Sequence, residues 1–155
     1  VGKVKDAEEV CRTVGKGSFN SDWHIYIDDI EKQTGRKISE KQRKALLNEL
    51  NKDPHSIKLE GKDYSNHRKD FNSVKDSLIQ DWENNTGEKW PTYSNDVISK
   101  RGNVYIKAGS NYDAHEIIPN KNNSPLEWWN IHPAANPTEH QGGIHRTGGT
   151  IRKIF

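Results

Sequence analysis

Apolar residues recur at every third or fourth position through the first half of the chain, and this spacing is typical of amphipathic helices. It predicts four helices, at residues 7–14, 21–34, about 40–51 and about 65–84. The second helix carries its apolar face at these positions: Trp23, Tyr26, Ile27 and Ile30. The chain up to about residue 85 is therefore expected to be mostly helical.

Residues that favour helix ends border these segments. Ser39 is of the type that caps a first turn, and Thr34-Gly35 is typical of a last turn. Pro54 follows the third predicted helix as a stop, and Gly87 follows the fourth. The signals at the ends agree with the apolar spacing inside.

Beyond residue 87 the pattern changes from helical to extended. Residues 103–107 alternate and are rich in strand-forming types. The elements expected after them are a turn at 109–111, an extended segment or strand at 112–118, a polar loop at 119–125, an apolar cluster at 126–131 and a short helix at about 137–146. Gly142-Gly143 must weaken or end that helix.

The predicted fold class is α+β, a mostly helical N-terminal half followed by a smaller part with strands. A length of 155 residues fits one domain, or one domain with a small helical companion. We expect a soft boundary near residues 85–100, which divides the chain into a helical region, 1–85, and a second domain, 86–155. The helical region is expected to serve entry, linkage or partner binding.

Composition predicts a small core, because only 30% of residues are hydrophobic and 30% are charged. Five Trp and five Tyr are expected to supply much of that core. Cys11 is the single cysteine, so no internal disulfide forms. No apolar run is long enough for a membrane span, and no signal peptide is visible. The chain begins at Val1, from which we expect it to be part of a longer protein.

The net charge of +2 conceals an asymmetry between the two halves. Residues 1–75 hold 16 Lys and Arg against 13 Asp and Glu, and residues 76–155 hold 8 against 9. The second half is thus no basic DNA-binding surface by composition. If it binds nucleic acid, a bound cation and a few placed Lys or Arg must supply the positive field.

Four of the seven histidines lie in the last third of the chain, at His115, His132, His140 and His145. Imidazole and carboxylate groups bind divalent metals, and a neutral imidazole accepts a proton near pH 7. Adjacent residues of a strand point to opposite faces, so His115 and Glu116 reach one site only where the strand bends. The alternative is a surface dipeptide beside a buried Ile-Ile pair.

His140 and His145 are five positions apart, close to one helical turn. This spacing suits two metal ligands if Gly-Gly distorts the backbone between them; the alternative is a solvated turn. Asn130 either bridges two backbone segments or ligates a metal through its carbonyl oxygen. His132 is a further ligand, a phosphate contact or a loop histidine, and the sequence leaves these open.

Taken together, the order of these residues resembles the HNH or His-Me finger (ββα-metal) nucleases. The spacing is 15 positions from His115 to Asn130 and 10 from Asn130 to His140. The strings around Asn130 and His140 are most like the bacterial polymorphic-toxin branch, which includes colicin-type DNases and the toxin domains of contact-dependent and LXG-type effectors. The resemblance covers residues about 103–147.

The resemblance implies that residues 86–155 form an HNH-type nuclease domain. It assigns metal binding to His115, His140 and His145, and a bracing role to Asn130. Glu116 stands in the slot that usually holds a general-base histidine. Three accounts remain open: Glu116 is the base; His115 is the base while Glu116 helps to hold the metal; or position 116 carries an inactivating change. A free carboxylate, with a pKa of about 4.3, is a weak base at neutral pH.

The resemblance also implies the reaction, a hydrolysis of phosphodiester bonds in DNA more than RNA, with one divalent cation (Zn, Mg, Ni or Mn). Arg146 either grips a phosphate oxygen or faces solvent. Lys107 and Lys121 are candidate backbone contacts. We expect an antibacterial toxin domain that is secreted or delivered within a larger effector, acts in the target-cell cytoplasm and is neutralised by a cognate immunity protein.

Two other functions compete with a nuclease. A non-catalytic zinc module that binds nucleic acid would coordinate its zinc ion with four protein ligands and leave no open position. These ligands would be His115, His140, His145 and a carboxylate. A plain helical interaction domain with incidental histidines would show no response to metal at all.

Overall fold

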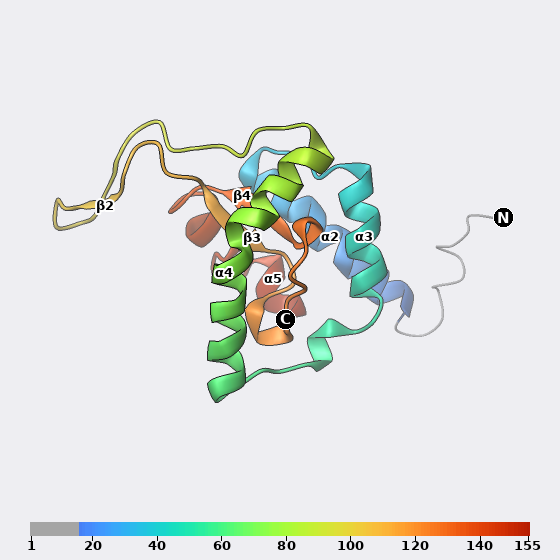
Figure 1. The fold of residues 1–155 in the computed structure, drawn as a ribbon. Coiled ribbons are helices and arrows are strands. Elements are labelled where there is room, and N and C mark those ends of the chain that lie inside the picture. The colour runs from blue at the N-terminus through green and yellow to red at the C-terminus, as the bar shows by residue number, and fades with distance from the viewer. Residues whose placement is uncertain (1–15) are drawn as a thin grey trace.

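The computed structural model describes residues 16–155, so the helix expected at 7–14 and the cysteine at position 11 lie outside the described part (Figure 1). The first half is helical, as the apolar spacing predicts. Its elements are α2 (Lys16–Thr34), α3 (Glu40–Leu50), a 3-10 turn at Pro54–Ser56 and α4 (Gly61–Thr86). Within residues 16–155 no helix is long and apolar enough to cross a membrane.

The last turns of α2 and α4 and the first turn of α3 lie where the sequence signals place them, whereas α2 and α4 begin about five and four residues earlier than expected. Ser39 caps α3, and its side chain accepts a hydrogen bond from the backbone N–H of Gln42. Gly35 follows α2 with φ of +69°, and Gly87 follows α4 with φ of +74°. These left-handed conformations favour glycine, which explains why both helices end there.

Within residues 16–155, four short strands form two separate antiparallel pairs. They are β1 (Val97–Ile98), β2 (Val104–Ile106), β3 (Asp113–Glu116) and β4 (Ile131–Ala134). The segments expected at 103–107 and 112–118 both contain strands, but they do not pair with each other. Instead β2 pairs with β1, and β3 pairs with β4 so that His115 lies opposite His132. Strands β1 and β4 were not expected, because β1 has only two residues and β4 contains a proline and follows an apolar cluster.

The C-terminal part is built from short turns of helix. It contains 3-10 turns at Asn120–Asn122 and Trp128–Asn130, a π-helical turn at His140–Ile144 and a short helix α5 (Thr150–Ile154). The short helix expected at 137–146 is present in part, as a π-helical turn. Its central five residues form a π-helix, in which each N–H bonds five residues back. Helix α5 was not expected.

Two hydrophobic clusters hold the elements together, and both combine helices with the β3–β4 pair or its flanks. In the first, α2 and α3 pack against the segment after β3, the π-helical turn and α5. In the second, α4 packs against Trp90 and Ile131. From α3, the Gln42 amide donates hydrogen bonds to the carbonyl oxygens of Trp129 and Ile131, at 3.1 and 2.8 Å. The α+β class is confirmed, and β3–β4 lies under cover of the helices.

Candidate metal centre

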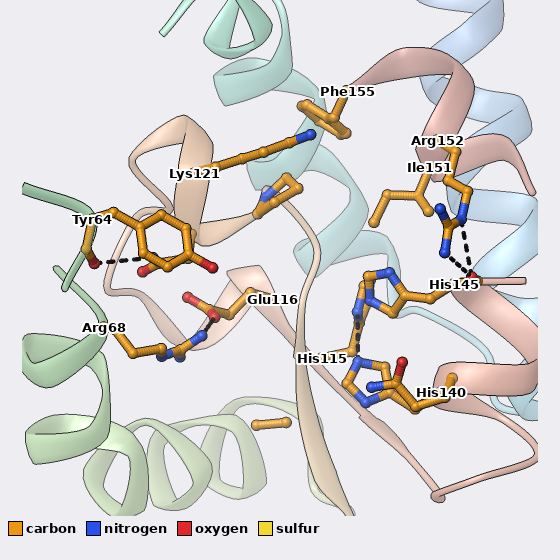
Figure 2. Close-up of a pocket in the computed structure, with 14 residues that line it drawn as sticks. Tyr64, Arg68, His115, Glu116, Lys121, His140, His145, Ile151, Arg152 and Phe155 are labelled. Atoms are coloured by element: carbon orange, nitrogen blue, oxygen red, sulfur yellow. Dashed lines mark hydrogen bonds and ion pairs between the residues drawn. The ribbon is translucent and has the colours of Figure 1, made fainter. Parts of the chain in front are cut away.

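Three histidines meet at the end of β3, two of them five positions apart and the third 25 positions earlier in the chain. His115 lies on β3, His140 begins the π-helical turn and His145 follows it. One ring nitrogen of each lies within 4.8 Å of the others. The ring centroids are 4.8 to 5.2 Å apart (Figure 2). The three side chains therefore surround a common point.

The π-helical turn explains how residues five apart reach one site. The backbone N–H of His145 donates to the carbonyl of His140 at 2.9 Å, and that of Ile144 donates to Glu139 at 2.9 Å. Because a π-helix bonds at i and i+5, its turn is wider than an α-helical one. His140 and His145 thus lie on the same face, and the expected distortion between them is present.

The glycine pair permits this turn to pack closely. A Cβ on Gly143 would lie 2.8 Å from the carbonyl oxygen of Thr138 and 3.2 Å from the Cβ of Gln33 on α2. A Cβ on Gly142 would lie 3.0 Å from the carbonyl oxygen of Pro137. A side chain at Gly142 would clash with the preceding turn of the chain, and one at Gly143 would clash with both that turn and α2. The glycines therefore permit the close packing that places His140 and His145.

Tyr26 of helix α2 sets the orientation of His115. Its hydroxyl donates to the carbonyl oxygen of Ile117 at 2.5 Å and lies 3.0 Å from Nε2 of His115. Because the single hydroxyl proton is used, the Nε2–H of His115 donates to the tyrosine oxygen. The Nδ1 lone pair of His115 then faces His140, 3.3 Å away. Burial raises the pKa of Tyr26 well above its usual value, so the hydroxyl stays protonated.

Asp113 sets the orientation of His140 in the same way. Its Oδ2 lies 3.0 Å from Nδ1 of His140 and accepts a hydrogen bond from that nitrogen. In the neutral ring, Nε2 of His140 therefore carries a lone pair, and this lone pair faces Nδ1 of His115. Two lone pairs 3.3 Å apart repel each other unless a cation or a proton lies beside them. The pair of rings is arranged for a cation.

Two of the three rings are held neutral at physiological pH. Burial, followed by the fields of His140 and His145, lowers the pKa of His115 well below its usual value. Burial, followed by His140 and Arg152, lowers the pKa of His145 to about 4. Neutral imidazoles are the form that binds metal. Ring nitrogens held by Tyr26 and Asp113 are typical of metal-ligating histidines. The donor set fits a divalent ion, and the cluster could hold one.

The cluster lines an open pocket of about 510 Å³, within the size range of small-ligand sites. Glu116 also lines it, on the side toward α4 (Figure 2). Its Oε1 forms an ion pair with Arg68 at 2.7 Å, and its Oε2 accepts from the Ser124 hydroxyl at 2.6 Å. Arg68 and Ser124 thus hold the carboxylate on the α4 side of the pocket, and it is not one of the three converging groups.

Asn130 braces the chain where β3 ends. Its Oδ1 accepts from the backbone N–H of Ile118 at 2.8 Å, and its Nδ2 donates to the carbonyl of Ile118 at 3.2 Å. The residue is fully buried. Of the alternatives left open, the structure shows the bridge between two backbone segments.

His132 is buried opposite His115 but is not part of the cluster. Thr34 donates its hydroxyl proton to Ile30 at 2.8 Å, so the Thr34 oxygen accepts from Nε2 of His132 at 2.9 Å. Burial, followed by the field of Arg36, lowers the pKa of His132 to about 3. It is therefore a neutral histidine of the core rather than a loop residue.

Arg146 does not line the pocket. Its two terminal nitrogens form a bidentate ion pair with Asp29 of α2, at 3.0 and 2.9 Å, and one of them donates to the carbonyl of Gly143. The guanidinium thus ties the π-helical turn to α2. Its catalytic role remains a prediction.

Three residues of the site were not foreseen: Tyr26, Arg68 and Asp113. Asp113 left a signal, since residues two apart in a strand share a face and it lies two before His115. Tyr26 and Arg68 left none, because each contacts the site across a long stretch of chain.

Comparison with known proteins finds two similar proteins. The chain is 41% identical to the Toxin YxiD of Bacillus subtilis (strain 168) over 155 residues, 99% of this chain and 27% of that protein. It is 33% identical to the Probable deoxyribonuclease RhsB of Dickeya dadantii (strain 3937) over 127 residues, 81% of this chain and 8% of that protein. No family model and no solved structure matches. The chain is therefore homologous to a part of each of two larger proteins and spans about a quarter of the first.

Proposed function

We propose that this chain is a metal-dependent endonuclease domain that hydrolyses phosphodiester bonds in DNA. The observation that carries the proposal is the convergence of three histidine nitrogens on the wall of an open pocket. The similarity to a probable deoxyribonuclease supports this reaction over other metal-dependent hydrolyses. In this proposal β3, β4 and the π-helical turn are the ββα-metal core.

His115, His140 and His145 would hold one divalent cation, of Zn, Mg, Ni or Mn. When bound, such a cation neutralises the charge that develops on the scissile phosphate and the leaving oxygen. Tyr26 and Asp113 keep two of the rings turned toward the common point. The protein then pays little reorganisation energy on loading, because the ligand nitrogens already converge.

Glu116 is the group that we propose to orient water or accept its proton. One ring nitrogen of His115 bonds Tyr26 and the other faces the cluster, so neither is free to accept a proton from water. A carboxylate offers about four acceptor positions, and Arg68 and Ser124 occupy two of those on Glu116. The carboxylate keeps acceptor capacity on a side chain that lines the pocket.

The open pocket favours a catalytic site over a structural zinc module. A structural zinc ion is closed by four protein ligands. Within residues 16–155 the cluster has three, and the nearby carboxylates are committed, Asp113 to His140 and Glu116 to Arg68. An open coordination position is what a catalytic metal requires.

We also propose the biological setting that the sequence suggests. The chain would act as an antibacterial toxin domain of a larger effector, in the cytoplasm of the target cell, and a cognate immunity protein would neutralise it. Support comes from the similarity to the Toxin YxiD, of which the chain spans 27%.

The test is a plasmid-nicking assay with Zn, Mg, Ni and Mn on the protein and on His115→Ala and His140→Ala. We expect both variants to lose nicking, and to lose zinc binding by calorimetry, because each removes one of three ligands. His24→Ala is the matched control, since His24 contacts Arg43 outside the pocket. Full nicking by either variant would contradict the proposal, and zinc binding without any nicking would favour the structural module.

A further inference from the structure

Three cationic side chains from three separate elements line the same pocket as the histidines. They are Arg68 of α4, Lys121 of the 3-10 turn Asn120–Asn122 and Arg152 of α5. Figure 2 shows Arg68 and Lys121 on one side of β3 and Arg152 on the other, beside His145. The carboxylate that lines the pocket is that of Glu116. The lining thus has an excess of positive charge, although its half of the chain does not.

Arg152 is held next to the histidine cluster without a carboxylate partner. Its Nε and Nη2 both donate to the backbone carbonyl oxygen of His145, at 3.1 Å each. Within residues 16–155 it forms no ion pair. The guanidinium is exposed, and its Nη1 makes no hydrogen bond to the described residues. It therefore offers charge and donors to a ligand while its position is fixed.

Lys121 has a fixed backbone and a free side chain. Its carbonyl oxygen accepts a hydrogen bond from the N–H of Leu59 at 2.6 Å, which ties the turn to the segment before α4. Its ammonium has no ion-pair partner in the described part of the chain. Figure 2 shows the side chain extended along the pocket toward Phe155.

Arg68 completes the set on the α4 side. One of its terminal nitrogens pairs with Glu116 at 2.7 Å, and its guanidinium lies over the ring of Phe71, 4.6 Å from the centroid. A guanidinium carries five N–H donors, so the ion pair leaves others for a ligand. Of the three cations that the sequence suggested as phosphate contacts, Lys121 lines the pocket. Lys107 and Arg146 do not, and Arg146 is paired with Asp29.

We propose that Arg152 and Lys121 bind the phosphates on either side of the scissile one, with Arg68 assisting beside Glu116. The ligand is then a DNA strand that crosses the pocket, because the histidine cluster would hold the scissile phosphate and the cations of the lining would hold its neighbours. A mononucleotide has no neighbouring phosphates and could not make both contacts. This inference rests on the proposed function. In it, Arg152, Lys121 and Arg68 bind the DNA backbone, and Arg68 of α4 is the contribution of the helical half of the chain.

The test is the salt dependence of DNA binding by Arg152→Gln and Lys121→Gln. Fluorescence anisotropy of a labelled single-stranded DNA oligonucleotide is measured with EDTA present, so that no cleavage occurs. Each lost phosphate contact should reduce the slope of log K against log[salt] by roughly 0.7, which is about fivefold in affinity near 0.1 M salt. Lys153→Gln is the control, because Lys153 is the exposed neighbour on α5 and does not line the pocket.

Slopes for Arg152→Gln and Lys121→Gln equal to that of Lys153→Gln would overturn the inference. If calorimetry shows that Arg152→Gln also loses zinc affinity, its effect on DNA binding could come from a disturbed metal centre. The Lys121→Gln slope is then the deciding measurement, because the Lys121 side chain supports no other group. Thymidine monophosphate should not displace the strand at matched phosphate concentration, and full displacement would also overturn it. If the protein nicks no plasmid with any metal yet the slopes differ, the nuclease proposal fails and the phosphate contacts stand.

Discussion

The two strand pairs of this protein are built alike and placed in opposite surroundings. Each is antiparallel and only a few residues long. In β1–β2 the side chains of Ile98 and Tyr105 are 54% and 64% exposed, whereas in β3–β4 those of His115 and Ile131 are 1% and 0% exposed. Figure 1 shows β1–β2 extending away from the helices, while β3–β4 lies among them.

This difference teaches where a small sheet can carry chemistry. An isolated two-stranded pair is marginally stable in water, so β1–β2 cannot hold side chains in a defined geometry. Around β3–β4, α2 supplies Tyr26, α3 supplies Gln42 and α4 supplies Arg68, each bonded to the pair or to its neighbours. The covering helices thus position the candidate metal centre.

Breaking the support under β3–β4 should have the largest effect. Asn130→Ala removes two hydrogen bonds and leaves the N–H and C=O of Ile118 buried without partners, which should lower the free energy of unfolding by about 3 kcal/mol. Urea denaturation measures the change. The control is Asn103→Ala, in the exposed connection between β1 and β2, with an expected change within about 0.5 kcal/mol. Equal effects at both positions would refute the contrast.

The second largest effect should come from acid, which should destabilise the β3–β4 pair. The pKa of His132 is about 3 in the folded protein and about 6.5 when unfolded, so the unfolded state binds more protons between these values. Stability is therefore full above pH 6.5 and falls as the pH drops toward 3. From His132 alone the loss at pH 5 should be about 2 kcal/mol. Urea denaturation at pH 7 and pH 5 tests this; an unchanged midpoint would show that His132 is not buried and neutral.

The smallest expected effect is a loss of zinc affinity when the Tyr26 hydroxyl is removed. Tyr26→Phe removes the acceptor that fixes the His115 ring, so zinc affinity should fall about tenfold, or about 1.4 kcal/mol. Calorimetric titration with zinc measures it. Tyr105→Phe makes the same chemical change on the exposed pair and should leave the affinity as it was. A tenfold loss in both variants, or in neither, would remove Tyr26 from the site.

The helical half could be predicted closely from the sequence because its signals are local. The apolar face of α2 and the caps at Ser39 and Gly87 act within one or two turns of chain. Residues five apart around Gly-Gly likewise indicated a distorted turn between His140 and His145. The strand pairing could not be predicted, since β4 follows a tight apolar cluster and carries a proline within its four residues.

By itself, the sequence determined the three long helices of the described residues, the positions where they end and the residue types from which a metal centre can be made. Only the tertiary structure decided which residues meet: Tyr26 with His115, Arg68 with Glu116, and Asp29 with Arg146. Local propensity depends on neighbours along the chain, and it therefore shows in the sequence. Convergence depends on how α2 and α4 pack over β3–β4, and contacts between residues tens of positions apart leave no local pattern to detect.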